Sequence, residues 1–104
     1  MAVVKITGEA EFTKEILQDA GLVLVHFYTD NCQYCQMVAG PLEKTSEEFA
    51  GKLKVCSLDA DVDIDLARKY RIDTVPTFIL FQKGTVVKVQ TVSIPRPEIL
   101  KLVK

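Results

Sequence analysis

The sequence of 104 residues contains no tryptophan, a single histidine and only three cysteines. Its 13 basic residues are balanced by 14 acidic ones, so it lacks the concentrated positive charge that binding to nucleic acid requires. Its most apolar stretch, Leu22 to Tyr28, includes His26 and is far too short to span a bilayer. We therefore expect neither nucleic-acid nor membrane partners.

The amino-terminal residues fit neither a signal peptide nor a transit peptide, because the acidic Glu9 and Glu11 come early. The length and the 48% hydrophobic content suit one compact domain, which we expect to be cytoplasmic. An odd number of cysteines in a reducing compartment argues against a structural disulfide framework. The cysteines are then inert core residues, metal ligands or redox groups, and that choice decides the function.

Hydrophobic periodicity predicts the element order β-α-β-α-β-α-β-β-α. The expected strands are Val3–Ile6, Leu22–Thr29, Leu53–Asp59, Thr77–Gln82 and Thr85–Val92. The first expected helix carries Phe12, Ile16, Leu17 and Ala20, with Gly21 as its C-cap. Two further helices are expected over residues 32–49, with Pro41 inside, and over residues 64–70. A last helix is expected after Pro95 and Pro97, and it carries Ile99, Leu100, Leu102 and Val103. The early alternation implies parallel crossovers and the hairpin at Lys83-Gly84 adds an antiparallel edge, so an α/β fold with a mixed sheet and helices on both faces is expected.

Cys32 and Cys35 stand three residues apart where the buried strand ends and a helix begins. Unpaired N–H groups and the helix dipole favour negative charge at a helix N-terminus, so a thiol there loses its proton more easily. The thiolate is the form that attacks disulfides, and a second cysteine one turn further on can resolve the mixed disulfide. A CxxC motif in this strand–helix context indicates redox chemistry.

With this motif the chain resembles the thioredoxin family from end to end. The matching stretches are Val23 to Tyr28, Leu58-Asp59-Ala60-Asp61, Val75-Pro76-Thr77-Phe78 and Phe81-Gln82-Lys83-Gly84. The resemblance implies one thioredoxin-like domain over residues 1–104, with a five-stranded mixed sheet, four helices and disulfide oxidoreductase activity. It also implies a cis Val75–Pro76 bond that places Pro76 against the cysteine pair, with the backbone before it pairing with substrate. From this resemblance we expect a monomer that binds no cofactor and that receives its electrons from a separate reductase, a flavoprotein.

The departures from the family pattern mark this chain as an atypical member. The family usually has Trp-Cys-Gly-Pro-Cys, whereas this chain has Asn31, Cys32, Gln33, Tyr34 and Cys35. The family's buried acidic residue before the motif is His26 here, its lysine partner matches Ser57, and a rim glycine matches Val92. We expect His26 to take part in proton transfer, although a neutral core histidine is the alternative. Tyr34 is expected to contact substrate, with solvent-side packing as its alternative.

Two metal-binding interpretations, zinc and calcium, have weaker support in the sequence than the redox interpretation. A zinc site needs four ligands, and only Cys56 and His26 remain to complete the set with the CxxC pair. Cys56, in an apolar strand, is better interpreted as a structural core residue. The alternating Asp59, Asp61, Asp63 and Asp65 imitate a calcium loop, but Ile64 and Tyr70 occupy the positions that require Gly and Glu, so capping of a strand end and a helix start is favoured. No metal is expected.

The sequence thus predicts an enzyme that reduces protein disulfides through Cys32 and Cys35. A thioredoxin-fold binding module whose cysteines no longer turn over is the first alternative. An oxidase or isomerase with a less reducing potential is the second.

Overall fold

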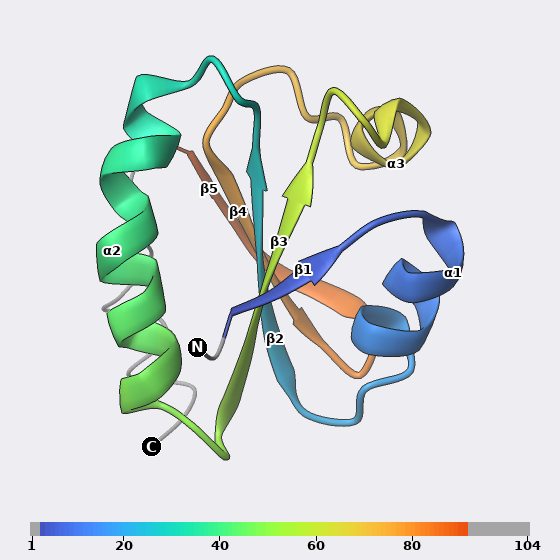
Figure 1. Ribbon diagram of the computed structural model, residues 1–104. Helices are drawn as coiled ribbons and strands as arrows, with labels where there is room; N and C mark the ends of the chain where they lie inside the picture. The colour runs from blue at the N-terminus through green and yellow to red at the C-terminus, as the bar shows by residue number, and fades with distance from the viewer. Residues whose placement is uncertain (1–2, 92–104) are drawn as a thin grey trace.

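The computed structural model describes residues 3–91, which form a five-stranded sheet with helices on both faces (Figure 1). In chain order the elements are β1 (Val3–Ile6), α1 (Glu9–Phe12), the π-helical η1 (Thr13–Leu17), β2 (Leu22–Tyr28), α2 (Gln33–Glu48), β3 (Leu53–Asp59), α3 (Ile64–Lys69), β4 (Thr77–Gln82) and β5 (Thr85–Thr91). The expected last helix and Val92 lie outside the described residues, and a single domain over residues 1–104 stays a prediction.

The strand order across the sheet is β1-β3-β2-β4-β5. The β1–β3 and β2–β3 pairs are parallel, while β4 pairs antiparallel with both β2 and β5. The predicted mixed sheet is therefore confirmed. No helix within residues 3–91 is long and apolar enough to cross a membrane.

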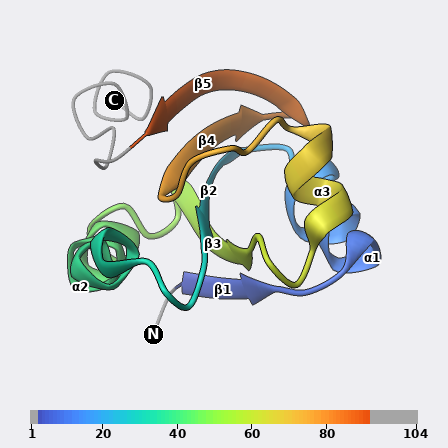
Figure 2. The same ribbon diagram turned by 90° about the horizontal axis from the view of Figure 1, so that it is seen from above.

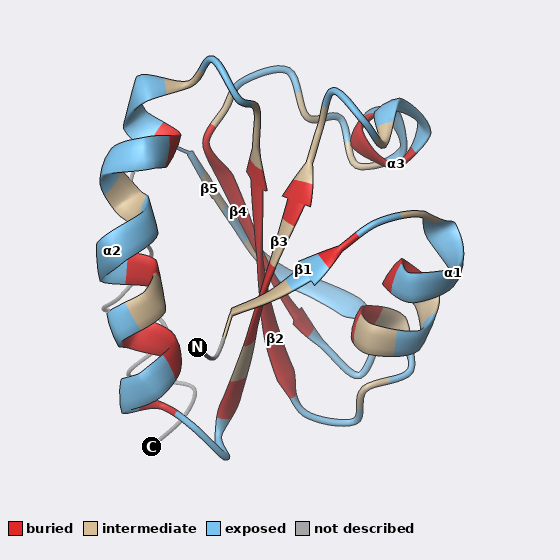
Figure 3. Ribbon diagram, in the orientation of Figure 1, coloured by how far each residue is buried: buried red, intermediate tan, exposed pale blue. Residues whose placement is uncertain are grey.

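Side-chain alternation along the central strand β2 separates two cores. Val23, Val25 and Phe27 face the side covered by α1, η1 and α3, whereas Leu22 and Leu24 pack with residues of α2. Figure 2 shows α2 on one side of the sheet and α1 and α3 on the other. The burial of β2 on both faces (Figure 3) is the pattern that its continuous apolar run predicts. His26 shares its parity with Leu24 and so belongs to the α2 side.

The helix α2 agrees with its predicted bounds, because Cys32 is its N-cap and Phe49 its C-cap. Its inward stripe consists of half-buried Val38 and the buried side chains of Leu42, Thr45 and Phe49. Pro41 lies inside the helix, and its carbonyl accepts a hydrogen bond from the Thr45 hydroxyl at 2.9 Å. The exposed position of Pro41 keeps the missing backbone hydrogen bond at the solvent side.

The first helix differs from the prediction. It was expected to include Ala20 and to end at Gly21, but the chain changes from α1 to the wider η1, which ends at Leu17. The N–H of the C-cap residue Gln18 donates to the Thr13 carbonyl at 2.9 Å. The Asp19 carboxylate then accepts the Gly21 N–H at 2.8 Å, an Asx turn that leads directly into β2. Periodicity alone does not register this local hydrogen bond. Phe12 and Ile16 are buried as predicted.

The β4–β5 hairpin turns at Lys83 and Gly84, both of which have positive φ, at 52° and 78°. A Cβ atom at Gly84 would lie 2.7 Å from the backbone carbonyl oxygen of Leu17 in η1. The turn therefore packs closely against η1 and requires glycine for both conformation and space.

Substitution Gly84→Ala should lower the free energy of unfolding by about 1–3 kcal/mol, because a strained φ and a backbone clash add together. The matched control is Gly40→Ala within α2, where a Cβ atom would meet nothing within 4 Å. That change should be neutral or raise stability by up to about 1 kcal/mol through helix propensity. Urea unfolding midpoints measure both effects, and equal midpoints for the two variants would contradict the proposed close approach.

Candidate active site

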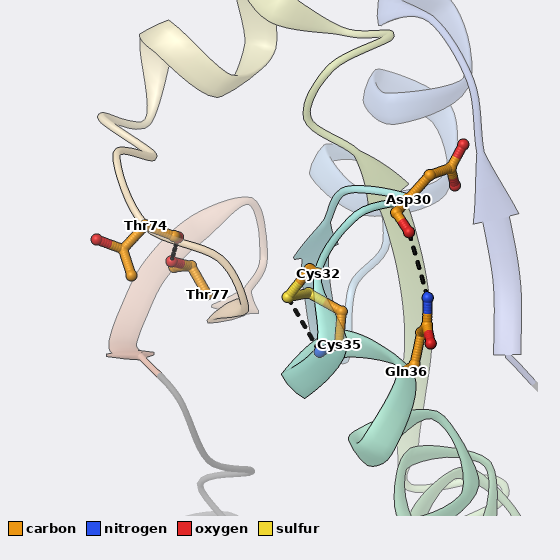
Figure 4. The surroundings of a disulfide bond; sticks show 6 residues. All are labelled: Asp30, Cys32, Cys35, Gln36, Thr74 and Thr77. Carbon is orange, nitrogen blue, oxygen red and sulfur yellow. Dashed lines mark hydrogen bonds between the residues drawn. A yellow bond between two sulfur atoms is a disulfide. The ribbon is translucent and has the colours of Figure 1, made fainter.

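Cys32 and Cys35 form a disulfide at the amino end of α2 (Figure 4). Cys32 is the N-cap residue, and its Sγ atom accepts a hydrogen bond from the Cys35 backbone N–H at 3.0 Å. The Cα atoms of the two cysteines are 5.2 Å apart. Cys32 is half-buried, whereas Cys35 is only 4% exposed. The predicted position between a buried strand and a helix is therefore present, with one sulfur more accessible than the other.

The electrostatics of this helix start favour a thiolate at Cys32 once the disulfide is reduced. The first turn of α2 carries no acidic residue that would oppose it. A backbone N–H already points at the Cys32 sulfur, and the helix dipole adds positive potential there. These are the conditions under which a thiol pKa falls below its ordinary value. Chemically, the arrangement can attack a disulfide and then close on itself.

The loop before β4 approaches the same region. The Val75–Pro76 peptide bond is cis, as the family resemblance implies. Val75 is half-buried and Pro76 is buried. A surface groove is lined by Thr74 and Val75 of this loop together with Thr29, which follows β2, and Ala60 and Ile72. Figure 4 shows this loop beside the cysteine pair. Contact of Pro76 with the sulfur atoms stays a prediction.

His26 is a buried side chain on the α2 side of the sheet, 4% exposed. Its ring stacks on Phe78 with centroids 4.8 Å apart and an interplanar angle of 12°. Its Nε2 atom is buried and has no hydrogen-bond partner. Burial lowers the pKa of His26 from 6.5 to about 4, so the imidazole is neutral at physiological pH.

A cavity of about 280 Å³ connects the surroundings of His26 with those of Cys35. Both residues line it, and so do Ser57 of β3, Ala39 of α2 and Asp30 of the preceding loop. Ser57 pairs with His26 in the β2–β3 register, so the two positions at which the family has a buried charged pair are neighbours here without that charge. His26 and Cys35 are thus brought to one cavity, although no direct hydrogen bond joins them.

Two large exposed side chains lie on α2 close in sequence to the cysteine pair. Tyr34 is 57% exposed, in agreement with its predicted position, and Met37 is 69% exposed. Sequence reasoning did not single out Met37. The signal was present, because Met37 follows Tyr34 by three residues and lies off the inward stripe that begins at Val38.

The third cysteine belongs to the opposite core. Cys56 is fully buried among the residues that pack with α1, η1 and α3, and burial raises the pKa of its thiol to about 12. It therefore stays protonated and unreactive at neutral pH. The zinc alternative fails on geometry, because Cys56 and His26 face opposite sides of the sheet. Within residues 3–91, no group of three or more His, Cys, Asp or Glu side chains could hold a metal ion.

The four alternating aspartates do not converge on a calcium site. The Asp59 carboxylate accepts backbone N–H groups of Asp61 and Val62 at 2.8 and 3.3 Å. The Asp63 carboxylate accepts the Gly8 N–H at 3.1 and 3.2 Å, which ties α3 to the loop after β1. Asp63 is the N-cap residue of α3, but its side chain does not cap that helix, contrary to the expected capping role.

The depressed pKa of His26 predicts a pH-dependent loss of stability. The unfolded chain binds a proton at His26 near pH 6.5, whereas the folded protein resists it until about pH 4. Stability from this group is therefore present above pH 6.5 and falls as the pH drops toward 4, by up to about 3 kcal/mol at about 1.4 kcal/mol per pKa unit.

Substitution His26→Phe keeps a ring for stacking on Phe78 and removes this titration. It should also raise the free energy of unfolding at neutral pH by about 1–2 kcal/mol, because an unsatisfied buried nitrogen disappears. Urea unfolding from pH 7 to pH 4 measures the free energy of unfolding of the parent and of the variant. The carboxylates are the same in both proteins, so their contribution cancels from the difference. Parallel pH curves would contradict the neutral, buried state assigned to His26.

Comparisons with known proteins agree with this geometry. The family model described as Thioredoxin matches residues 3–104. Thioredoxin of Pseudomonas aeruginosa is 37% identical over 84 residues, covering 81% of this chain and 77% of the relative. Thioredoxin C-2 of Corynebacterium nephridii is 34% identical over 93 residues, covering 89% and 86%.

Thioredoxin of Mycobacterium tuberculosis is 39% identical over 87 residues, covering 84% of this chain and 74% of the relative. Among solved structures, a mutant thioredoxin from Halobacterium salinarum superposes with a TM-score of 0.83 and 28% identity, covering 97% of this chain and 87% of that chain. With a Cys-x-x-Cys disulfide at the amino end of a helix and a matching fold, the chain belongs to the thioredoxin family of thiol–disulfide oxidoreductases.

Proposed function

We propose that the protein reduces disulfides of substrate proteins, with Cys32 as nucleophile and Cys35 as resolving residue. The observation that carries this proposal is the Cys32 sulfur at the N-cap of α2, accepting the Cys35 N–H at 3.0 Å, while Cys35 itself is buried. The accessible sulfur is the one whose anion the helix stabilises. The family implies disulfide-containing substrates and a reductase partner.

The exchange proceeds in two steps. The Cys32 thiolate attacks one sulfur of the substrate disulfide, forming a mixed disulfide and releasing the other substrate sulfur as a thiolate that takes up a proton. Cys35 then loses its proton and attacks the Cys32 sulfur, which releases the second substrate thiol and leaves the Cys32–Cys35 disulfide. Two electrons have passed to the substrate, and a reductase must restore them before the next cycle.

His26 is our proposed proton acceptor for the second step. Desolvation disfavours the Cys35 thiolate while a substrate covers the site, so a nearby base lowers the barrier. His26 lines the same cavity as Cys35, is neutral because its pKa is about 4, and has an Nε2 atom without another partner. A neutral imidazole there needs no cationic partner, which is consistent with Ser57 on the neighbouring strand.

Substrate contacts are proposed at Tyr34, Val75 and Pro76. Tyr34 offers an exposed aromatic ring one residue before Cys35, in place of the apolar residue that Asn31 replaces. Val75 lines the groove that runs past Thr29 toward Ala60, so an extended substrate segment can lie along it. The proposed cycle requires no cofactor or metal bound to this chain.

We further propose that the reductase is a flavoprotein and that the protein acts as a monomer in the cytoplasm. A reducing compartment favours the dithiol state that this reaction direction requires. An oxidase or isomerase role is the second candidate, because a neutral His26 in place of a buried carboxylate removes a charge that would repel the Cys32 thiolate. Thioredoxin has a reduction potential of about −270 mV, and a clearly less negative potential for this protein would favour the oxidase or isomerase role.

The roles of the two cysteines can be separated by substitution. Cys32→Ser should abolish reduction of insulin disulfides, whereas Cys35→Ser should attack but accumulate mixed disulfides, because resolution is missing. Cys56→Ala is the matched control and should retain the activity. Thiol titration of the parent should show two thiols lost reversibly on mild oxidation, with Cys56 remaining. If neither thiol is lost reversibly, the protein is a binding module whose cysteines do not turn over. If iodoacetamide labels Cys35 faster than Cys32, the nucleophilic and resolving roles are reversed.

The proposed base predicts a specific defect in the resolving step. In single-turnover reduction of a model disulfide, His26→Ala should slow resolution by about 10²-fold and leave the first attack nearly unchanged. His26→Asp should partly restore it, since a carboxylate can also accept the proton. In the parent, resolution should decline as the pH falls toward about 4, where His26 becomes protonated. An unchanged resolution rate in His26→Ala would make His26 an ordinary core residue.

A further inference from the structure

The loop of residues 29–32, between β2 and α2, is joined to the helix by a side-chain hydrogen bond. The Gln36 Nε2 atom donates to the Asp30 carbonyl oxygen at 3.2 Å, as Figure 4 shows. Gln36 lies in the first turn of α2, and Asp30 precedes Cys32 by two residues. This bond joins the segment before Cys32 to the segment after it, and neither sulfur atom takes part in it.

Part of this loop borders a cavity instead of a filled core. Thr29 and Asp30 line the cavity of about 280 Å³, together with Gln36 and Ala39 of α2. On the side that borders the cavity, the loop has fewer of the close contacts that a well-packed core provides. Hydrogen bonds therefore contribute more to its position than they would on a filled core.

Reduction of the disulfide makes that support important. The oxidised protein has a covalent S–S bond between Cys32 and Cys35, and the dithiol has none. The hydrogen bond from the Cys35 N–H to the Cys32 sulfur survives only if the sulfur stays over the helix end. On the downstream side of Cys32, the Gln36 backbone N–H donates to the Cys32 carbonyl at 3.2 Å. On the upstream side, the Cys32 N–H donates to the Thr29 carbonyl at 3.2 Å, and the Gln36 side chain adds a second bond through the Asp30 carbonyl.

We propose that Gln36 is a positioning residue, whose amide holds the Asp30 carbonyl and so keeps the Cys32 sulfur over the amino end of α2 after the disulfide opens. This inference rests on the proposed nucleophilic role of Cys32. The ionisable side chains that line the cavity are His26, Tyr28, Asp30, Cys35 and Glu43, and replacing Gln36 by a neutral residue removes none of them.

Two neutral variants test the bond. Gln36→Met retains the length without the donor, and Gln36→Asn retains the donor without the reach. In both, Cys32 should be alkylated about two- to fivefold more slowly below neutral pH, because one exposed hydrogen bond transmits a modest effect. The equilibrium with glutathione should shift by a similar factor toward the protein disulfide, because the reduced form loses stability.

The oxidised forms should unfold at nearly the parent temperature, because the S–S bond still holds the loop. Gln18→Met, at the exposed end of η1, is the matched control and should behave as the parent in every measurement. Parental alkylation profiles in both variants, or a change in only one of them, would overturn the role of Gln36. If parental Cys32 is itself no more reactive than a free thiol, it is the proposed nucleophilic role that fails.

Discussion

The double pairing of β2 is the constraint on which the rest of the structure depends. This strand is hydrogen-bonded to β3 on one edge and to β4 on the other, and it is buried on both faces. Because successive side chains point to opposite faces, a shift by one residue would exchange the two cores and turn His26 away from α2. The same register fixes where β2 ends, and therefore where the cysteine loop and α2 begin.

The chemistry then follows from the start of α2. The N-cap acceptor of α2 is the Cys32 sulfur, where an oxygen is usual. The same atom therefore caps the helix and lies in the positive potential of the helix N-terminus, which favours a thiolate. The burial of Cys35 against the half-buried Cys32 makes the two thiols unequal, although their sequence context is similar. One helix end thus brings a more accessible cysteine and a more shielded one together within one turn.

Beneath the cysteine pair, this chain uses a neutral imidazole where a buried charged pair is the family's pattern. An isolated buried charge would be costly, and the low pKa of His26 avoids it. The neutral group remains imperfectly satisfied, since Nε2 has no partner, and the small Ser57 side chain faces the same cavity. An unsatisfied buried nitrogen in a residue that lines the same cavity as Cys35 is the observation behind the proton-acceptor role proposed above.

Much of the fold and of the site could be predicted from local pattern. The strands Leu53–Asp59 and Thr77–Gln82 were predicted with their observed bounds, and the extent of α2 agreed because apolar spacing and strong turn signals coincide there. The first helix was predicted too long, because η1 ends at Leu17 and the Asp19 carboxylate accepts the Gly21 N–H in the turn that follows. Gln36 was not identified, since a side-chain hydrogen bond across a loop leaves no periodic signal. Met37 was not identified although its spacing from Tyr34 was visible in the sequence.

The amino-acid sequence by itself determined the α/β element order, the burial of β2 and the presence of a redox CxxC at a helix start, because these depend on residues close together in the chain. Only the tertiary structure decided that His26 and Cys35 share a cavity, that Cys56 lies in the opposite core, and that Gln36 holds the Asp30 carbonyl. These relations depend on strand register and helix placement, which arise when segments distant in sequence pack together and which no local pattern encodes.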